Sequence, residues 1–198
     1  VSSLAWVAKG SEPSFCHGLD CPVYTVLAEK EGYEIRLYNA SKWVGTTVED
    51  LSWDNAGKTG FQLVADYISG ANSAKEKIPM ALRVAVKIVP GQGPACDSSF
   101  TVLFFIPFSY QANTPAPTNP NVTIVELPSL TVYVGVYGGD PTDDTVVQNA
   151  DQLANNLQRD NENFVSDFFF TGTYDSPYFN YPNQHKADRH NEVWLLAA

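Results

Sequence analysis

The chain has 198 residues, of which 44% are apolar and 17% are charged, and its formal net charge is −10 at pH 7. This length and apolar content predict a single compact domain with a sizeable core rather than a disordered chain. The negative charge argues against binding to nucleic-acid phosphates or to anionic membrane surfaces. No run of about 18 apolar residues is present that could span a bilayer.

The cysteines bear on the cellular compartment. Four residues separate Cys16 from Cys21 in a turn-like segment, and Cys96 lies in another loop. Three loop cysteines indicate one disulfide and one odd thiol. Cys16 and Cys21 form the nearest pair, while Cys96 remains a possible partner for either. The alternative is three unpaired thiols in a cytosolic protein.

Two further features favour secretion. The chain begins at Val1 without a basic region, as a mature form with its signal peptide removed would, although a trimmed chain would begin in the same way. Asn39 and Asn121 each open an Asn-x-Ser/Thr triplet, the acceptor sequence for N-glycosylation in secreted proteins. We therefore expect an extracellular glycoprotein.

Hydrophobic patterns predict one α+β domain over residues 23–198, after an irregular N-terminal segment 1–22. Apolar and polar side chains alternate over 33–38, as in a half-buried strand. Between Asp54, a candidate N-cap, and Gly70, a candidate C′ residue, apolar side chains recur at helical spacing. The expected elements of this part are strands at 24–28, 33–38, 42–48, 80–89 and 100–106 and a helix at 54–69.

A stretch rich in Pro, Asn and Thr, 111–121, divides the chain, and its composition predicts an extended connector that does not pack. After it the same order of elements returns. The expected elements of the second part are strands at 122–126, 131–137, 164–174 and 192–196 and a helix with its cap region at 140–143 and an apolar stripe of Val146, Ala150, Leu153 and Leu157.

The two parts, about 23–110 and 122–198, therefore correspond element by element. The strand at 42–48 matches the one at 131–137, and the two later strands and the helix of each part match in the same way. Neither unit can bury its sheet alone, so antiparallel association into a curved sheet or barrel, with one helix outside each half, is expected.

Several strings of residues resemble the SOUL/haem-binding-protein family. They are YEIRLY at 33–38, KWV at 42–44, VPGQGP at 89–94, LPSLTVYV at 127–134 and NEVWL at 191–195. These strings occur in family order from about Tyr24 to Leu196, so the resemblance covers nearly the whole chain.

The resemblance implies a distorted antiparallel β-barrel with two flanking helices and an internal pseudo-two-fold, related to bacterial effector-binding domains. It also implies affinity for haem or another tetrapyrrole. The resemblance places this ligand in an apolar groove between the first helix and the loop that joins the last two strands.

Candidate ligand contacts follow from this placement. On the helix, Phe61, Val64 and Ile68 are candidates to line the groove, although packing of an amphipathic helix on its sheet accounts for them as well. The loop contributes three aromatic side chains that either contact the ligand or anchor the loop. These are Tyr178, Phe179 and Tyr181.

The same loop carries charged and metal-ligating side chains. Lys186 and Arg189 can pair with the carboxylates of a tetrapyrrole, with solvated surface charge as the alternative. His185 and His190 are candidate ligands of iron or another metal, although their spacing matches no regular metal motif.

No nucleophile elbow, Gly-rich phosphate loop, His-Glu-x-x-His or Cys-x-x-Cys motif is present. We therefore expect a binding protein rather than an enzyme: a secreted carrier or scavenger of haem, another tetrapyrrole or a similar planar hydrophobic ligand. The alternatives are an enzyme or light-emitting protein that uses the same groove on a small aromatic substrate, and a protein-interaction module.

Overall fold

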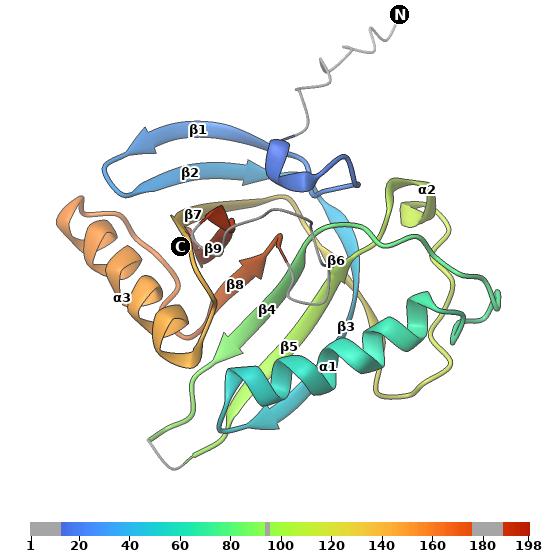
Figure 1. The fold of residues 1–198 in the computed structure, drawn as a ribbon. Helices are drawn as coiled ribbons and strands as arrows, with labels where there is room; N and C mark the ends of the chain where they lie inside the picture. Colours follow the sequence, from blue (N-terminus) through green and yellow to red (C-terminus); the bar gives the residue numbers. More distant parts are fainter. Residues whose placement is uncertain (1–12, 94–95, 176–187) are drawn as a thin grey trace, which may run out of the picture.

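The computed structural model describes residues 13–93, 96–175 and 188–198 of the chain. In this part, one antiparallel sheet of nine strands is covered on its outer face by two long helices (Figure 1), which confirms the α+β class. The strands are β1 (Tyr24–Lys30), β2 (Tyr33–Tyr38), β3 (Ser41–Asp50), β4 (Val84–Val89), β5 (Ser98–Phe105), β6 (Thr123–Leu127), β7 (Leu130–Tyr137), β8 (Phe169–Thr173) and β9 (Asn191–Leu196). The helices are η1 (Ser14–Cys16, 3-10), α1 (Trp53–Ile68), α2 (Phe108–Gln111) and α3 (Asp143–Arg159).

The strand order has the symmetry expected of a repeated unit. Across the sheet the order is β1-β2-β7-β9-β8-β4-β5-β3-β6. Outward from the contact between β8 and β4, the strands β4, β5, β3 and β6 correspond to β8, β9, β7 and β2. In the chain β2 leads into β3 but pairs with β7, while β6 leads into β7 but pairs with β3. One strand of each half therefore pairs with a strand of the other half, and this exchange joins the halves in one sheet.

The hydrogen-bonded sheet is open, whereas the expected barrel would be a closed sheet. It ends at β1 and β6, which share no pairing in the part of the chain that the structure describes. The sheet nevertheless curves far enough for side chains near both ends, including Tyr24 on β1 and Val125 on β6, to pack on one inner cluster. Side-chain packing therefore closes the concave face, which backbone pairing leaves open.

Helix α1 begins slightly before the expected residue. The N-cap is Ser52, whose side chain accepts a hydrogen bond from the backbone N–H of Asn55, whereas Asp54 lies in the first turn. A carboxylate in that position is favourable because it faces the positive end of the helix dipole. Gly70, with φ of 126°, follows the end of the helix as predicted.

Helix α3 has the cap and the apolar stripe that the sequence predicts. Thr142, which lies in the expected cap region, is the N-cap and forms a reciprocal capping box with Thr145. The buried face of the helix consists of Val146, Ala150, Leu153, Asn156 and Leu157. It covers β7 and β9, as α1 covers β3 and β5.

The connector at 111–121 does pack, contrary to the expectation from its composition. Ser73 and Ala116 exchange hydrogen bonds, and Tyr67 on α1 donates its hydroxyl to the carbonyl of Pro115. Polar contacts hold this stretch against the end of α1, so its low apolar content was a poor guide.

Two strands are shorter than expected. Strand β4 starts at Val84 rather than at residue 80, because the N–H of Leu82 bonds to the carbonyl of Asp20 in the N-terminal segment. Strand β8 starts at Phe169 rather than at residue 164, since Phe164 forms only an isolated bridge with Ala197.

The N-terminal segment contains the disulfide Cys16–Cys21, which confirms the nearest pairing, and Cys96 is an exposed free cysteine. Apart from η1, residues 13–23 have no regular secondary structure. Among the described residues, no helix is long and apolar enough to cross a membrane.

Two glycines on α1 allow a test of how closely this helix lies on the sheet. A Cβ at Gly60 would stand 2.4 Å from Val102 Cγ2, whereas a Cβ at Gly57 would meet nothing within 4 Å. We expect Gly60→Ala to lower the free energy of unfolding by about 1–3 kcal/mol through overpacking. Gly57→Ala should raise it by up to about 1 kcal/mol through helix propensity. Urea unfolding of both variants measures the difference, and equal effects would contradict the close approach.

Candidate functional site

A cavity of about 510 Å³ lies between α1 and the loop before α3, above the contact of β4 with β8. We call it the α1 cavity. Its position at this contact places it where the two halves of the chain meet. The lining residues are Trp53, Asp54, Gly57, Lys58, Phe61, Val84, Val86, Val102, Asp140, Pro141, Thr142, Thr171, Thr173 and Arg189.

The floor of the α1 cavity is apolar because strand side chains alternate between the two faces of the sheet. Val84 and Val86 on β4 point toward the helices, while Ala85 between them packs on the inner face. In the β4–β8 register, Val86 lies opposite Thr171 and Val84 opposite Thr173. The floor is therefore made of short branched side chains, which leave space below α1.

One wall of the cavity is the exposed side of α1. Phe61 lies with its ring 5.0 Å from that of Phe104, so it both anchors the helix and faces the cavity. Gly57, one turn earlier, adds no side chain, and this keeps the space between Trp53 and Phe61 open.

Charged side chains form the rim. Lys58 lies one turn after Asp54 on α1 and contacts its carboxylate at 2.6 Å. Across the cavity Arg189 forms an ion pair with Asp140, which precedes α3. Both ion pairs belong to the lining, so a carboxylate entering the cavity would reach Lys58 or Arg189 by sharing or replacing Asp54 or Asp140 as its partner.

The N-terminal ends of α1 and α3 are joined at this rim (Figure 1). Asp143 in the first turn of α3 accepts hydrogen bonds from the backbone N–H of Trp53 at 2.7 Å and from the Ser52 hydroxyl at 3.0 Å. A carboxylate in this place satisfies an otherwise unpaired N–H of helix α1 and balances its dipole. One acidic residue of the second half therefore fixes the helix of the first.

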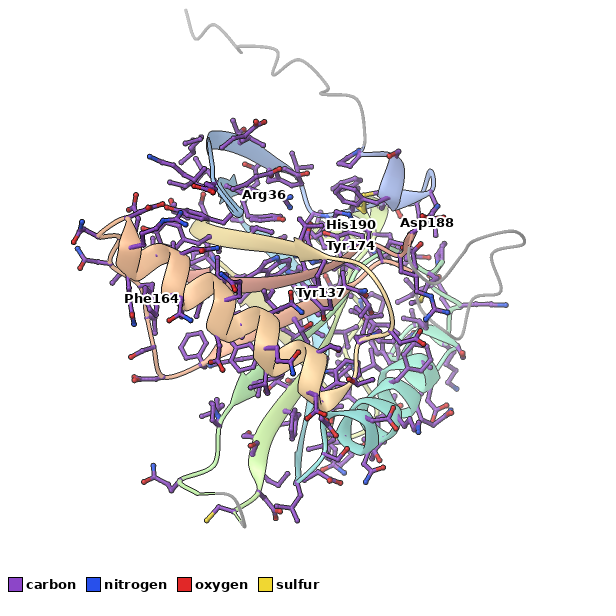
Figure 2. The ribbon with its side chains drawn as sticks, turned by 60° about the vertical axis from the view of Figure 1, so that its left-hand side comes forward. Arg36, Tyr137, Phe164, Tyr174, Asp188 and His190 are labelled. Atoms are coloured by element: carbon purple, nitrogen blue, oxygen red, sulfur yellow. A yellow bond between two sulfur atoms is a disulfide. The ribbon has the colours of Figure 1, made fainter. Side chains whose placement is uncertain are left out.

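Beneath the site, on the inner face of the sheet, lies a buried ionic cluster. Glu192 on β9 is fully buried and accepts hydrogen bonds from Arg36 at 2.9 Å and from Arg83 at 2.6 Å. Trp194 Nε1 and the Tyr174 hydroxyl also donate to this carboxylate. His190 is the fifth partner, with its Nε2 2.8 Å from Glu192 Oε1. Figure 2 labels three of the five partners, Arg36, Tyr174 and His190.

These contacts determine the charge state of Glu192. Burial by itself raises the pKa of this carboxyl, but Arg83, the hydrogen bond from His190 and Arg36 together lower the pKa far below its ordinary value. Burial likewise opposes the charge of Arg36 and Arg83, yet their neighbours, Glu192 among them, raise the pKa of both guanidinium groups. The cluster is therefore ionised inside the fold.

The structure brings together only some of the predicted ligand contacts. Phe61 and Arg189 both line the α1 cavity. Val64 is completely buried in the core below α1, and Ile68 packs against that core; neither belongs to the lining. The remaining loop candidates, Tyr178, Phe179, Tyr181, His185 and Lys186, lie outside the described residues.

His190 is turned away from the cavity. Its ring contacts Glu192 on one edge and stacks on Phe15 with the ring centres 3.9 Å apart. Within the described ranges no group of three His, Cys, Asp or Glu side chains could hold a metal ion. The metal-ligand role of His190 therefore gains no support from its surroundings.

Several site residues escaped the sequence reasoning. Asp140 and Asp143 were predicted only as cap residues, and Thr171 and Thr173 only as parts of a strand. The internal repeat could have identified these four residues. If β4 is matched with β8 and α1 with α3, the residues fall where the two halves of the chain meet. The ionic cluster gave no signal of this kind, since Arg36 lies at a polar position of an alternating strand, which predicts that it faces solvent.

Comparison with known proteins gives matches along nearly the whole chain. Residues 19–196 match the family described as SOUL heme-binding protein. Heme-binding protein 2 of Mus musculus is 34% identical over 194 residues, covering 96% of this chain and 90% of the mouse protein. Heme-binding protein 1 of Xenopus laevis is 30% identical over 170 residues, covering 85% and 86%.

Solved structures share the fold at low sequence identity. The crystal structure of the EcmrR C-terminal domain superposes with a TM-score of 0.60 at 9% identity, covering 89% of this chain and 98% of that domain. The structure of SAV2435 bound to tetraphenylphosphonium gives a TM-score of 0.50 at 14% identity, covering 84% and 93%. The fold is thus that of these effector-binding-like domains.

The ionic cluster predicts that the free energy of unfolding falls in acid. Because the pKa of Glu192 is lowered in the fold, its stabilisation is complete above the unfolded value of about 4.3 and is lost as the pH falls toward the folded value. We expect Glu192→Gln to cost about 3–5 kcal/mol of unfolding free energy at pH 7, since Arg36 and Arg83 lose their shared counter-ion.

The matched control is Glu34→Gln. Glu34 also contacts Arg36, at 2.7 Å, but its side chain is 33% exposed, so its loss should cost about 1 kcal/mol or less. Denaturant unfolding between pH 7 and pH 3 should show a shallower acid slope for Glu192→Gln than for the wild type. An unchanged slope would contradict the lowered pKa.

Proposed function

Because the chain belongs to the SOUL heme-binding protein family, we propose that it binds haem or a related tetrapyrrole in the α1 cavity. The observation that supports this most directly is the cavity itself, at about 510 Å³. Small-molecule sites usually measure about 300–1,000 Å³, with apolar walls and a few placed polar groups. The α1 cavity has this composition.

The walls suit a flat aromatic ring system. Val84, Val86 and Val102 offer an apolar floor, and Phe61 and Trp53 stand on the helix above it. Aromatic side chains favour offset or edge contacts with other rings. A macrocycle placed between the floor and the helix would remove both surfaces from water.

The rim suits the carboxylates of such a ligand. An anionic tetrapyrrole approaches a chain of net charge −10 against repulsion. Lys58 and Arg189 are the cations of the lining, and each can exchange its aspartate partner for a ligand carboxylate held by a charge-assisted hydrogen bond. Recognition would thus rest on the ring and its carboxylates, since the described lining includes no His, Cys, Met or Tyr side chain.

We further propose that the protein acts outside the cell as a carrier or scavenger. The disulfide Cys16–Cys21 supports an oxidising compartment. Both sequon residues, Asn39 and Asn121, are exposed and so accessible to a glycosylating enzyme. Intact mass of the protein from its natural source tests this: glycan mass and one disulfide are expected, and an unmodified, fully reduced chain would contradict it.

Filling the cavity from Gly57 tests the binding site. Optical titration of the wild type with hemin and with metal-free protoporphyrin should give saturable spectral changes at micromolar ligand. Gly57→Phe should weaken binding by about tenfold or more, equivalent to 1.4 kcal/mol, because the new ring occupies the space between Trp53 and Phe61. Gly57→Ala, which adds a Cβ in open space, is the matched control and should bind as the wild type does.

Each contrary outcome has a distinct meaning. No saturable change with any tetrapyrrole would refute the proposed ligand class. Equal affinity of Gly57→Phe and Gly57→Ala would place the ligand elsewhere. Turnover of a small aromatic substrate with oxygen consumption would favour an enzyme or light-emitting protein instead.

A further inference from the structure

The disulfide-closed segment at the N-terminus contacts the strand ends that border the α1 cavity, although it does not line the cavity itself. We infer that Phe15 is a positioning residue: by holding His190, it fixes Arg189 where the ligand's carboxylate is bound. This inference rests on the proposed function and adds to it a determinant of ligand specificity outside the cavity.

The segment is firmly placed. Cys16 and Cys21 are both buried, and they pack with Leu82 and Tyr174. The carbonyl of Asp20 accepts a hydrogen bond from the N–H of Leu82, and its carboxylate accepts one from the N–H of Phe108 at 2.8 Å. The disulfide therefore closes a small loop that is bonded to the body of the domain at several points.

From this loop, two side chains reach the ends of β8 and β9. The ring of Phe15 stacks on His190 at 9° between planes and meets Tyr174 edge-on at 4.6 Å. His17 Nε2 lies 2.7 Å from the buried carboxylate of Asp175. The second oxygen of Asp175 accepts the backbone N–H of His190 at 2.6 Å.

The hydrogen bond from the His190 N–H to Asp175 restricts the backbone next to Arg189. The N–H of His190 belongs to the planar peptide group that joins Arg189 to His190. Fixing this N–H on Asp175 and the His190 ring on Phe15 therefore sets the orientation of the backbone from which Arg189 extends. Arg189 then reaches Asp140 and the cavity rim.

The inner face of the domain holds His190 from the other side. Its Nε2 contacts Glu192 Oε1 in the ionic cluster, and Tyr174 N–H bonds to the carbonyl of His190. These bonds fix the position of β9 but leave one face of the imidazole ring to Phe15. Removal of Phe15 thus takes away the stacked support of the ring, while the bonds of His190 to Asp175, Tyr174 and Glu192 keep the sheet in place.

The test compares two iron porphyrins, of which only one carries carboxylates. Hemin carries carboxylates, whereas octaethylhaemin is an iron porphyrin without them. Phe15→Ala should weaken hemin binding by about three- to tenfold, the range expected for loss of one aromatic contact. Octaethylhaemin affinity should change by less than about twofold, since it has no carboxylate for Arg189.

Two variants separate positioning from general stability. Phe15→Tyr keeps the stacked ring and should bind hemin as the wild type does. In an Arg189→Gln background, Phe15→Ala should have no further effect on hemin, because the residue it positions is gone. Equal weakening of both ligands by Phe15→Ala, or an undiminished effect in the Arg189→Gln background, would overturn the inference.

A ligand-free measurement keeps this inference distinct from the proposed function. The guanidinium proton signal of Arg189, assigned by its absence in Arg189→Gln, should exchange with water faster in Phe15→Ala and unchanged in Phe15→Tyr. If this holds while no tetrapyrrole binds, the proposed ligand fails and the positioning stands. Unchanged exchange in Phe15→Ala would overturn the positioning whatever the ligand.

Discussion

The carboxylate of Glu192, shared by Arg36 and Arg83, is the interaction on which the arrangement of the sheet depends. It joins β9 of the second half to β2 and to the residue before β4 in the first half. Arg83 finds room because Gly172 on β8 has no side chain; a Cβ there would stand 2.8 Å from Arg83 Nε. A buried charge of this kind is costly unless it is fully paired, so the strands must meet in one register for the cluster to be satisfied.

The register in turn creates the α1 cavity. With β4 and β8 side by side at the centre of the sheet, short side chains of both halves form one floor, and the helices meet over it at their N-terminal ends. The two halves then contribute unequally. The first supplies the aromatic wall on α1, and the second supplies Asp140, Asp143 and Arg189 at the rim. A symmetric frame thus produces an asymmetric site, with an apolar wall from one half and a charged rim mainly from the other.

The site is connected to both faces of the sheet and to the N-terminus. His190 contacts the ionic cluster through Glu192 and the disulfide-closed segment through Phe15, while its neighbour Arg189 reaches the cavity. The ionic cluster, the N-terminal segment and the cavity rim therefore meet at the two residues just before β9. This connection is the physical basis of the positioning role that we propose for Phe15.

The sequence by itself determined the order of the elements, the repeat and the family, because hydrophobic periodicity and short motifs are properties of residues close together in the chain. It also indicated the disulfide and two residues of the cavity lining, Phe61 and Arg189. Only the tertiary structure decided that Val64 belongs to the core, that residues 111–121 pack, and that Asp143 caps a helix 90 positions away. Only the tertiary structure, too, showed that Arg36 and Glu192 are buried. Charged residues in alternating strands normally face water, and their burial becomes affordable in free energy only when distant strands bring opposite charges together.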